Sequence, residues 1–156
     1  MSDRPANVHG TAIVVGTAGL IFVGPSGSGK SSLAFACLAE ARALRLSAAL
    51  VADDQVLVSM DGPDVVADCP PAIAGLIEVR GTGILTLPYR APAVLHYAVA
   101  PVDLAHAERL PPEGERIDLA EGISLPLIRL SSSVRHPLAV IMAKIPRAFP
   151  PANPQV

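Results

Sequence analysis

The apolar and polar positions in the first third of the chain predict a hairpin, a helix and a third strand. The apolar runs TAIVV (11–15) and LIFV (20–23) are separated by the short link GTAG, a pattern typical of a β-hairpin. Residues 31–45 are rich in alanine and leucine and predict a helix. Three apolar residues are expected near one face of this helix: Leu33, Cys37 and Leu44. The apolar run 48–52 predicts a short strand that ends on two acids.

Strand-like patterns dominate the rest of the chain. They cover a second hairpin around DGPD in 56–69, a segment interrupted by two glycines in 77–87, and the runs 93–102 and 125–130. Residues 70–76 indicate a turn or a short helical segment, 103–122 a polar surface segment, and 136–145 a helix with Pro137 in its first turn. Because strands outnumber helices and few β-α-β units are visible, we expect a compact α/β domain with a mixed sheet and few helices.

Between the first hairpin and the first helix lies GPSGSGKS, which fits the pattern G-x-x-x-x-G-K-[ST] at every position. Glycines let backbone N–H groups close around phosphate oxygens, and the following helix points its positive end at the same anion. The motif predicts a nucleoside triphosphate with Mg²⁺, with Lys30 at the β- and γ-phosphates and Ser31 on the metal. The residues expected to bind the nucleotide are Gly24, Pro25, Ser26, Gly27, Ser28, Gly29, Lys30, Ser31 and Ser32. Hydrolysis, transfer and sensing without chemistry all stay open at this point.

Two adjacent acids, Asp53 and Asp54, follow the apolar run 48–52. They have three interpretations: a solvated loop, a Mg²⁺ ligand of Walker B type, or a general base for an incoming hydroxyl group. Adjacent residues of an extended chain point to opposite faces, so we expect the two acids to have different functions. The pattern does not say which one faces the phosphate.

A second constellation is Glu78 and Arg80, which are two residues apart and therefore on one face of a strand. They are either an ordinary ion pair or part of a site, and the two glycines that follow favour close backbone approach to another group. The four histidines share no metal-binding spacing, so a histidine-based zinc site is not expected; they are His9, His96, His106 and His136.

Composition narrows the classes of partner. The chain has 51% hydrophobic residues and a net charge of −2. Because it is not basic, we expect no electrostatic attraction to nucleic acid or to an anionic membrane. No apolar run approaches the ~20 residues of a membrane span. Cys37 and Cys69 form neither a CxxC motif nor a metal spacing, and we expect buried, reduced thiols. The polar N-terminus lacks a signal-peptide pattern, which predicts a cytoplasmic protein. We expect one domain over 1–145 and a mobile, proline-rich tail over 146–156.

Taken together, the motifs resemble the catalytic domain of the bacterial HPr kinase/phosphorylase family. VHGTAIVVGTAGLIFVGPSGSGKSSLA is similar to the family's entry hairpin and phosphate loop, LVADDQV to its acidic motif, and LIEVRGTGIL to its signature. The resemblance implies a P-loop domain of HPr kinase type that uses ATP and Mg²⁺ to phosphorylate a serine of HPr, the small carrier protein of the phosphotransferase system, or of an HPr paralogue. It also implies the reverse, dephosphorylating reaction and assembly into a homo-oligomer.

On the nucleotide side, the resemblance implies that Lys30 grips the transferred phosphate and that Ser31 and Glu78 hold Mg²⁺. Ser32 stands where the family usually has glutamate. The alternative function is a nucleotide-binding regulatory module without phosphoryl transfer. A small-molecule kinase would rest on the phosphate loop alone, and no arginine-rich lid segment is visible for it.

On the acceptor side, the resemblance implies that Asp54 deprotonates the substrate serine, with Asp53 beside it. His9 and Arg80 are expected in the same site. A weaker similarity of the segment AERLP implies a functional role for Arg109.

Overall fold

The computed structural model describes residues 4–150. Its elements, in chain order, are β1 (Ala6–Val15), β2 (Ala18–Val23), α1 (Lys30–Ala43), β3 (Ala48–Asp61), β4 (Asp64–Asp68), η1 (Pro71–Ile73), β5 (Leu76–Val79), β6 (Gly83–Thr86), β7 (Ala93–Leu95), β8 (Tyr97–Val102), β9 (Arg116–Ala120), β10 (Ile123–Ser131), α2 (Pro137–Lys144) and η2 (Pro146–Ala148). The expected class, mixed α/β with few helices, is confirmed: two α-helices accompany ten strands in this part of the chain.

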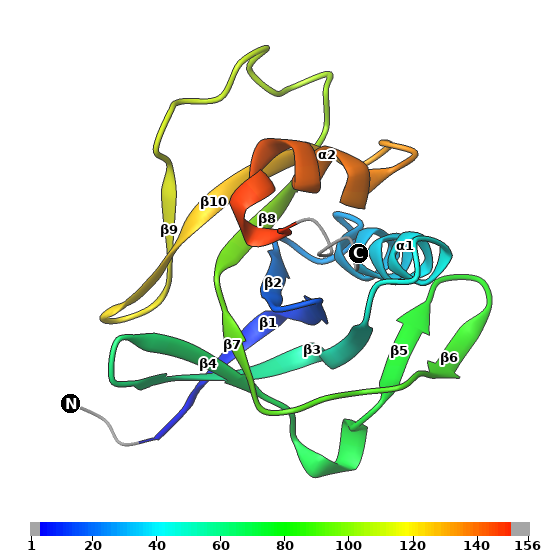
Figure 1. The fold of residues 1–156 in the computed structure, drawn as a ribbon, viewed down its shortest axis with the longest axis vertical. Helices are drawn as coiled ribbons and strands as arrows, with labels where there is room; N and C mark the ends of the chain where they lie inside the picture. The colour runs from blue at the N-terminus through cyan, green and yellow to red at the C-terminus, as the bar shows by residue number, and fades with distance from the viewer. Residues whose placement is uncertain (1–3, 151–156) are drawn as a thin grey trace, which may run out of the picture.

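Eight of the described strands form one mixed sheet in the order β7-β4-β3-β1-β2-β8-β10-β9 (Figure 1). The pairs β2–β8 and β8–β10 are parallel, and the other neighbours are antiparallel. The remaining two strands, β5 and β6, pair only with each other as a separate hairpin. β1 lies between β3 and β2, so the first strand of the hairpin pairs with a strand that begins more than thirty residues after β1 ends.

The alternation of side chains along β1 and β2 divides the core into two clusters. Ile13 and Phe22 belong to a cluster that α1 and α2 cover, so both helices pack on one face of the sheet. The other face buries residues from both ends of the sheet, such as Val65 of β4 and Leu125 of β10. The sheet therefore curls until its distant strands share one core, as Figure 1 shows.

Five details differ from the expected elements. The strand that begins at Ala48 runs through both acids to Asp61, because its second half pairs with β1 as well as with β4. Segment 77–87 forms the hairpin β5–β6, with its turn at the glycines. Segment 93–102 is broken at His96, and the polar segment 103–122 contains β9. Leu44 is 56% exposed, because α1 ends at Ala43 and Leu44 leaves the buried face.

The expected tail is partly ordered. Pro146–Ala148 form the 3₁₀ helix η2, and Phe149 packs against the cluster under the helices. This packing was not anticipated, because proline disfavours α-helix and sheet interiors but suits the first turn of a 3₁₀ helix. The rest of the expected tail, 151–156, lies outside the described residues. Within residues 4–150, no helix is both long and apolar enough to cross a membrane.

Candidate active site

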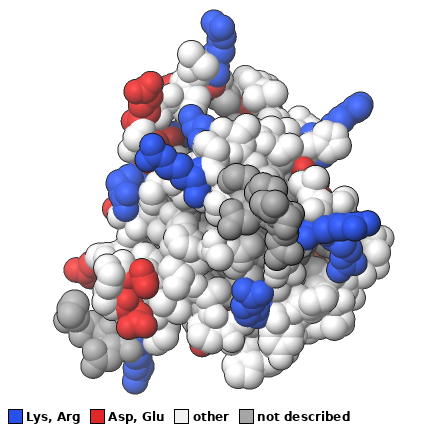
Figure 2. Space-filling view, in the orientation of Figure 1, with Lys and Arg blue, Asp and Glu red and all other residues white. Residues whose placement is uncertain are grey.

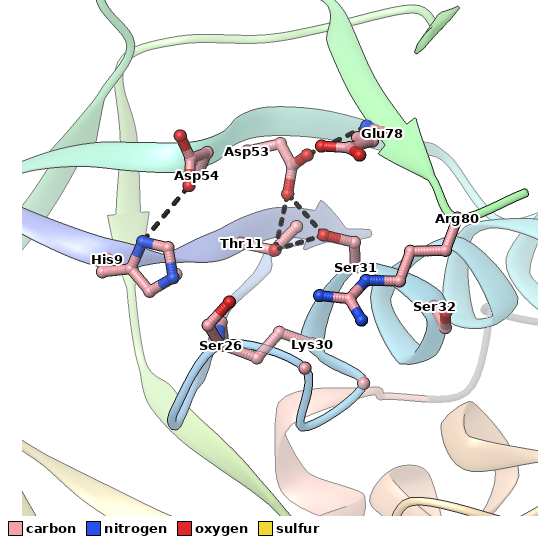
Figure 3. A pocket seen from close by; sticks show the side chains of 13 residues that line it. His9, Thr11, Ser26, Lys30, Ser31, Ser32, Asp53, Asp54, Glu78 and Arg80 are labelled. Carbon is pink, nitrogen blue, oxygen red and sulfur yellow. Dashed lines mark hydrogen bonds and ion pairs between the residues drawn. The ribbon is translucent and has the colours of Figure 1, made fainter. Parts of the chain in front are cut away.

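A cleft of about 280 Å³ opens where β1, the phosphate loop, β3 and the β5–β6 hairpin meet (Figure 3). Its lining residues come from four segments far apart in the sequence: His9, Gly10, Thr11, Ser26, Gly27, Gly29, Lys30, Ser31, Ser32, Asp53, Asp54, Glu78 and Arg80. Every side chain that the sequence placed at a catalytic or metal position is in this set, except that of Arg109.

The glycine-rich loop between β2 and α1 leads directly into the first turn of the helix. α1 begins at Lys30, directly after Gly29, whose φ of 100° is left-handed and thus natural for glycine. The first turn of the helix therefore opens into the cleft with unpaired N–H groups. Gly24, Pro25 and Ser28 belong to the same loop but do not line the cleft. The buried Oγ of Ser28 has no hydrogen-bond partner among the described residues.

Lys30 is 8% exposed and folds back over its own loop. Its Nζ donates hydrogen bonds of 2.8 Å to the carbonyl oxygens of Gly24 and Pro25. An ammonium group has three N–H donors, so one stays available for an anion in the cleft. Burial lowers the pKa of Lys30 from its usual 10.5, the negative charges of Asp53 and Asp54 oppose this effect, and the positive charge of Arg80 adds to it.

Asp53 is a buried carboxylate, 6% exposed, at the centre of a small hydrogen-bond network. Its Oδ1 accepts from Thr11 Oγ1 at 2.7 Å and from Ser31 Oγ at 2.8 Å. Its Oδ2 accepts from the backbone N–H of Glu78 at 3.1 Å. β1, α1, β3 and β5 are therefore tied together at one side chain, directly beside the phosphate loop (Figure 3).

Asp54 lies in the same cleft, contrary to the expectation that the two acids face opposite sides. Its backbone φ of 71° is left-handed, which breaks the alternation of side chains along β3. The carboxylate therefore turns toward His9, whose Nδ1 lies 3.2 Å from Asp54 Oδ1. The two side chains are 55% and 66% exposed, so this ion pair lies at the mouth of the cleft, whereas Asp53 lies at its base.

Glu78 and Arg80 both line the cleft, and no ion pair joins them in the described structure. Arg80 lies in the turn after β5, and its guanidinium reaches over the phosphate loop (Figure 3). Both of its Nη atoms lie 3.7 Å from the place that a Cβ atom would occupy on Gly27. A Cβ atom at position 27 would thus be in ordinary van der Waals contact with the guanidinium, so Arg80 lies close to the loop at Gly27.

The oxygen atoms at the base of the cleft suit Mg²⁺. Hydroxyl and carboxylate oxygens are hard ligands, and Mg²⁺ in nucleotide sites typically takes few protein ligands beside phosphate oxygens and water. Ser31 Oγ, the Asp53 carboxylate and the Glu78 side chain provide such donors around one side of the loop. No group of three or more His, Cys, Asp or Glu side chains among residues 4–150 forms a complete metal cage by itself. The donor set therefore fits a metal that arrives with a nucleotide.

The structure does not bring Arg109 to these residues. It lies in the exposed connection between β8 and β9 and does not line the cleft. Its role stays a prediction from the resemblance. Thr11 was missed, because a threonine within an apolar strand gives no chemical signal of its own. A signal becomes visible only when β1 and β3 are paired, since Thr11 then lies opposite Asp53.

The charged residues outside the cleft form no single patch on the face drawn in Figure 2. Lys and Arg side chains are spread over this face between wide areas of uncharged atoms. The net charge of the chain, −2, agrees with this mixed distribution.

Comparison with known proteins places the chain among sequences of one family. A family model described as the HPr serine kinase C-terminal domain matches residues 3–90. An HPr kinase/phosphorylase of Burkholderia lata is 31% identical over 147 residues, covering 88% of this chain and 44% of the relative. One of Xylella fastidiosa is 36% identical over 83 residues, covering 53% and 24%. The chain thus spans less than half the length of these curated relatives.

A solved structure has the same fold. The HPr(Ser) kinase/phosphatase from Coxiella burnetii matches with a TM-score of 0.73 and 20% identity, over 91% of this chain and 95% of that one. At this identity the match shows the architecture, and the chemistry of the cleft has to be argued from its own residues.

Proposed function

The chain belongs to the family of HPr serine kinase C-terminal domains, and on this basis we propose that it transfers the γ-phosphoryl group of ATP to a serine of HPr or of a related phosphocarrier protein. The observation that carries the proposal is the convergence of the phosphate loop, both acids and Arg80 in one cleft. A binding site for ATP alone would need the loop, whereas transfer also needs a base on the acceptor side.

The two acids differ in burial and in hydrogen bonding, and these differences suit them to different roles. Asp53 is buried and accepts three hydrogen bonds, so it is suited to hold Ser31 and a metal and poorly suited to meet a protein substrate. Asp54 is exposed at the cleft mouth, where an incoming hydroxyl group can reach it. We assign the general base to Asp54 for this reason, in agreement with the resemblance.

The proposed transfer is a single displacement at the γ-phosphorus of ATP. The serine oxygen forms a bond to the γ-phosphorus, the bond from that phosphorus to the bridging oxygen breaks, and ADP leaves. The serine proton goes to the Asp54 carboxylate, and His9 beside it, at 3.2 Å, holds that carboxylate in position. Bound Mg²⁺ would neutralise part of the phosphate charge.

Positive charge at the transferred group comes from two side chains. Lys30 has one donor left after its bonds to the loop carbonyls, and Arg80 reaches over the loop at Gly27. A loose phosphoryl transition state gains most from such positioned positive charge. Because Arg80 follows β5, whose Glu78 N–H binds Asp53, the guanidinium and the buried acid are placed by the same hairpin.

The decisive experiment mixes the purified chain with ATP, Mg²⁺ and a purified HPr protein, and detects phosphoserine by mass spectrometry. The control is Asp54→Asn, with its fold checked by circular dichroism and its ATP binding by calorimetry. We expect phosphoserine with the unmodified chain and none with Asp54→Asn. Bound ATP with no phosphoserine, at several protein concentrations, would refute transfer to HPr.

A second function, a nucleotide-binding module without transfer, is favoured by one contrast in the cleft. Lys30 and Asp53 on the nucleotide side are buried and hydrogen-bonded, whereas His9 and Asp54 on the acceptor side are more than half exposed. The same experiment separates the two functions, since the module would bind ATP and label no acceptor. Adding inorganic phosphate and phosphorylated HPr tests the reverse reaction. A homo-oligomer and a cytoplasmic location belong to the leading proposal, and light scattering measures the former.

A further inference from the structure

Thr11 lies at the centre of the candidate site although it carries no ionisable group. It is 1% exposed on β1, opposite Asp53 in the pairing of β1 with β3. Its Oγ1 lies 2.7 Å from Asp53 Oδ1 and 3.3 Å from Ser31 Oγ. The neighbours of Thr11 along β1 are apolar and buried, so a hydroxyl group at this depth requires a partner.

The positions of the three oxygens define where the hydroxyl protons go. An ionised carboxylate only accepts hydrogen bonds, so Thr11 and Ser31 must both donate to Asp53 Oδ1. Neither hydroxyl proton is then left for the longer contact between Thr11 and Ser31. The lone pairs of Ser31 Oγ are consequently turned away from Asp53, and they are available to a cation in the cleft.

Asp53 can impose this order only while its own carboxylate is fixed. The backbone N–H of Glu78 holds Oδ2, and Thr11 is the donor that holds Oδ1 from the strand side. Without the Thr11 hydroxyl, Oδ1 would keep only Ser31, the group that it has to orient. Apart from Ser31 itself, the Glu78 N–H would then be the one group that still holds the carboxylate, which would rotate more freely.

We propose that Thr11 is a positioning residue that fixes Asp53 and thereby orients Ser31 as a ligand for the divalent cation that accompanies the nucleotide. The inference rests on the proposed function, because it assumes a metal–nucleotide complex in the cleft. It goes beyond that function because it gives a residue of β1, outside both the phosphate loop and the acidic motif, a part in positioning the metal ligand Ser31. Mg²⁺ demands a nearly ideal octahedral arrangement, whereas Ca²⁺ tolerates variable geometry, so the two ions should respond differently to the loss of Thr11.

The test measures binding of the non-hydrolysable ATP analogue AMP-PNP to the full chain by calorimetry, with EDTA, Mg²⁺ or Ca²⁺. In Thr11→Val we expect Mg²⁺ to strengthen binding about tenfold less than in the unmodified chain, the factor for one hydrogen bond to a charged group. The Ca²⁺ effect should fall by less than about threefold, and binding in EDTA should not change. Thr11→Ser should restore the Mg²⁺ effect, and the exposed Thr86→Val on β6 serves as the matched control.

The outcomes separate the inference from the function beneath it. No nucleotide binding by the unmodified chain would overturn the proposed function. Normal Mg²⁺ dependence in Thr11→Val, equal losses for Mg²⁺ and Ca²⁺, or failure of Thr11→Ser to rescue would each overturn the role of Thr11 alone. Thermal unfolding verifies that each variant folds. If Thr11→Val does not fold, Thr11→Cys replaces it, because a thiol of similar size is a weak donor and should show the same loss.

Discussion

The Asp54 carboxylate meets His9 across the mouth of the cleft, although the strand register places Asp54 opposite Gly10. A regular strand would direct this carboxylate to the other face of the sheet. The left-handed backbone at Asp54, with φ of 71°, brings it back to the face of His9 and Asp53. A strained conformation of a non-glycine residue is thus located at the position where the proposed base acts.

This strain predicts an unusual order of stability at position 54. In a regular strand alanine is more stable than glycine by roughly 0.5–1 kcal/mol. At a left-handed residue the order reverses, so Asp54→Gly should be about 1 kcal/mol more stable than Asp54→Ala. Urea unfolding followed by circular dichroism measures the difference. If alanine proves the more stable, the backbone at this position is not held in the left-handed region.

Replacement of the buried Lys30 by methionine should weaken ATP binding without lowering the free energy of unfolding near neutral pH. The folded-state pKa of Lys30 lies below its usual 10.5 because of burial, so the unfolded chain binds the proton more tightly. The stability of the unmodified chain should therefore rise relative to Lys30→Met as the pH increases through the folded pKa toward 10.5. Near neutral pH we expect Lys30→Met to be at least as stable, and to bind ATP poorly.

Urea unfolding at a series of pH values checks the Lys30 prediction. Calorimetry with ATP measures the affinity of the unmodified chain and of Lys30→Met for the nucleotide. A stability difference between the two proteins that stays constant with pH would show that the folded structure does not penalise the charge of Lys30.

Replacement of Arg80 should affect transfer more than binding. Arg80→Met removes the guanidinium that reaches over the loop, and we expect the rate of phosphoryl transfer to fall about 10²-fold. The affinity for AMP-PNP should change by less than about tenfold, since the loop and Lys30 are intact. Arg90→Met is the matched control, because Arg90 lies outside the cleft lining and its side chain contacts Ser47. Equal losses in affinity and rate would assign Arg80 to ground-state binding.

Gly19 should be the glycine that the fold tolerates least well in exchange for alanine. A Cβ atom there would lie within van der Waals overlap of the Val94 carbonyl oxygen on β7. We expect Gly19→Ala to lose about 3 kcal/mol or more of unfolding free energy. Gly62→Ala is the control: its left-handed φ of 58° costs about 1 kcal/mol, but nothing lies near the added methyl group. Similar melting temperatures for the two variants would contradict the close approach of β2 and β7.

The two cysteines should resist alkylation in the folded protein. Burial, with the nearby charge of Glu40, raises the pKa of Cys37 to about 12. Burial and Asp68 raise the pKa of Cys69 as well. At about pH 8 we expect iodoacetamide to modify Cys37 at least ~100-fold more slowly than in denaturant, because a pKa of about 12 leaves roughly 0.01% of the thiol as thiolate. Cys69 should also react more slowly in the folded protein than in denaturant. Mass spectrometry of timed samples measures the rates, and rapid labelling of Cys37 would contradict its burial.

Local patterns were sufficient for the elements that depend on neighbouring residues. The phosphate loop, α1 and α2 follow from glycines, apolar spacing and Pro137, and they lie where the sequence predicts them. The extent of β3 did not follow, because Asp53 and Asp54 disfavour a strand locally and are kept in one by pairing with β1. The left-handed Asp54 and the network around Thr11 depend on that same long-range pairing.

The polar segment 103–122 illustrates a second limit of the sequence. β9 (RIDLA) alternates polar and apolar residues, but over only five positions that follow a long polar, proline-containing stretch. Its pairing with β10 at the edge of the sheet becomes visible only in the structure. Arg109, predicted for the site, lies in the connection before this strand, where the sequence offers no means to calculate its distance from the cleft.

The central place of β1 and β3 in the sheet also determines how unfolding disrupts the site. The strands that hold His9, Thr11 and both acids are the ones that the rest of the sheet flanks on each side. Their amide protons should be among the slowest to exchange with solvent, and no partly opened form that separates them can retain a working cleft. Bound nucleotide should therefore protect the whole domain against unfolding and proteolysis, and not only the loop that it touches.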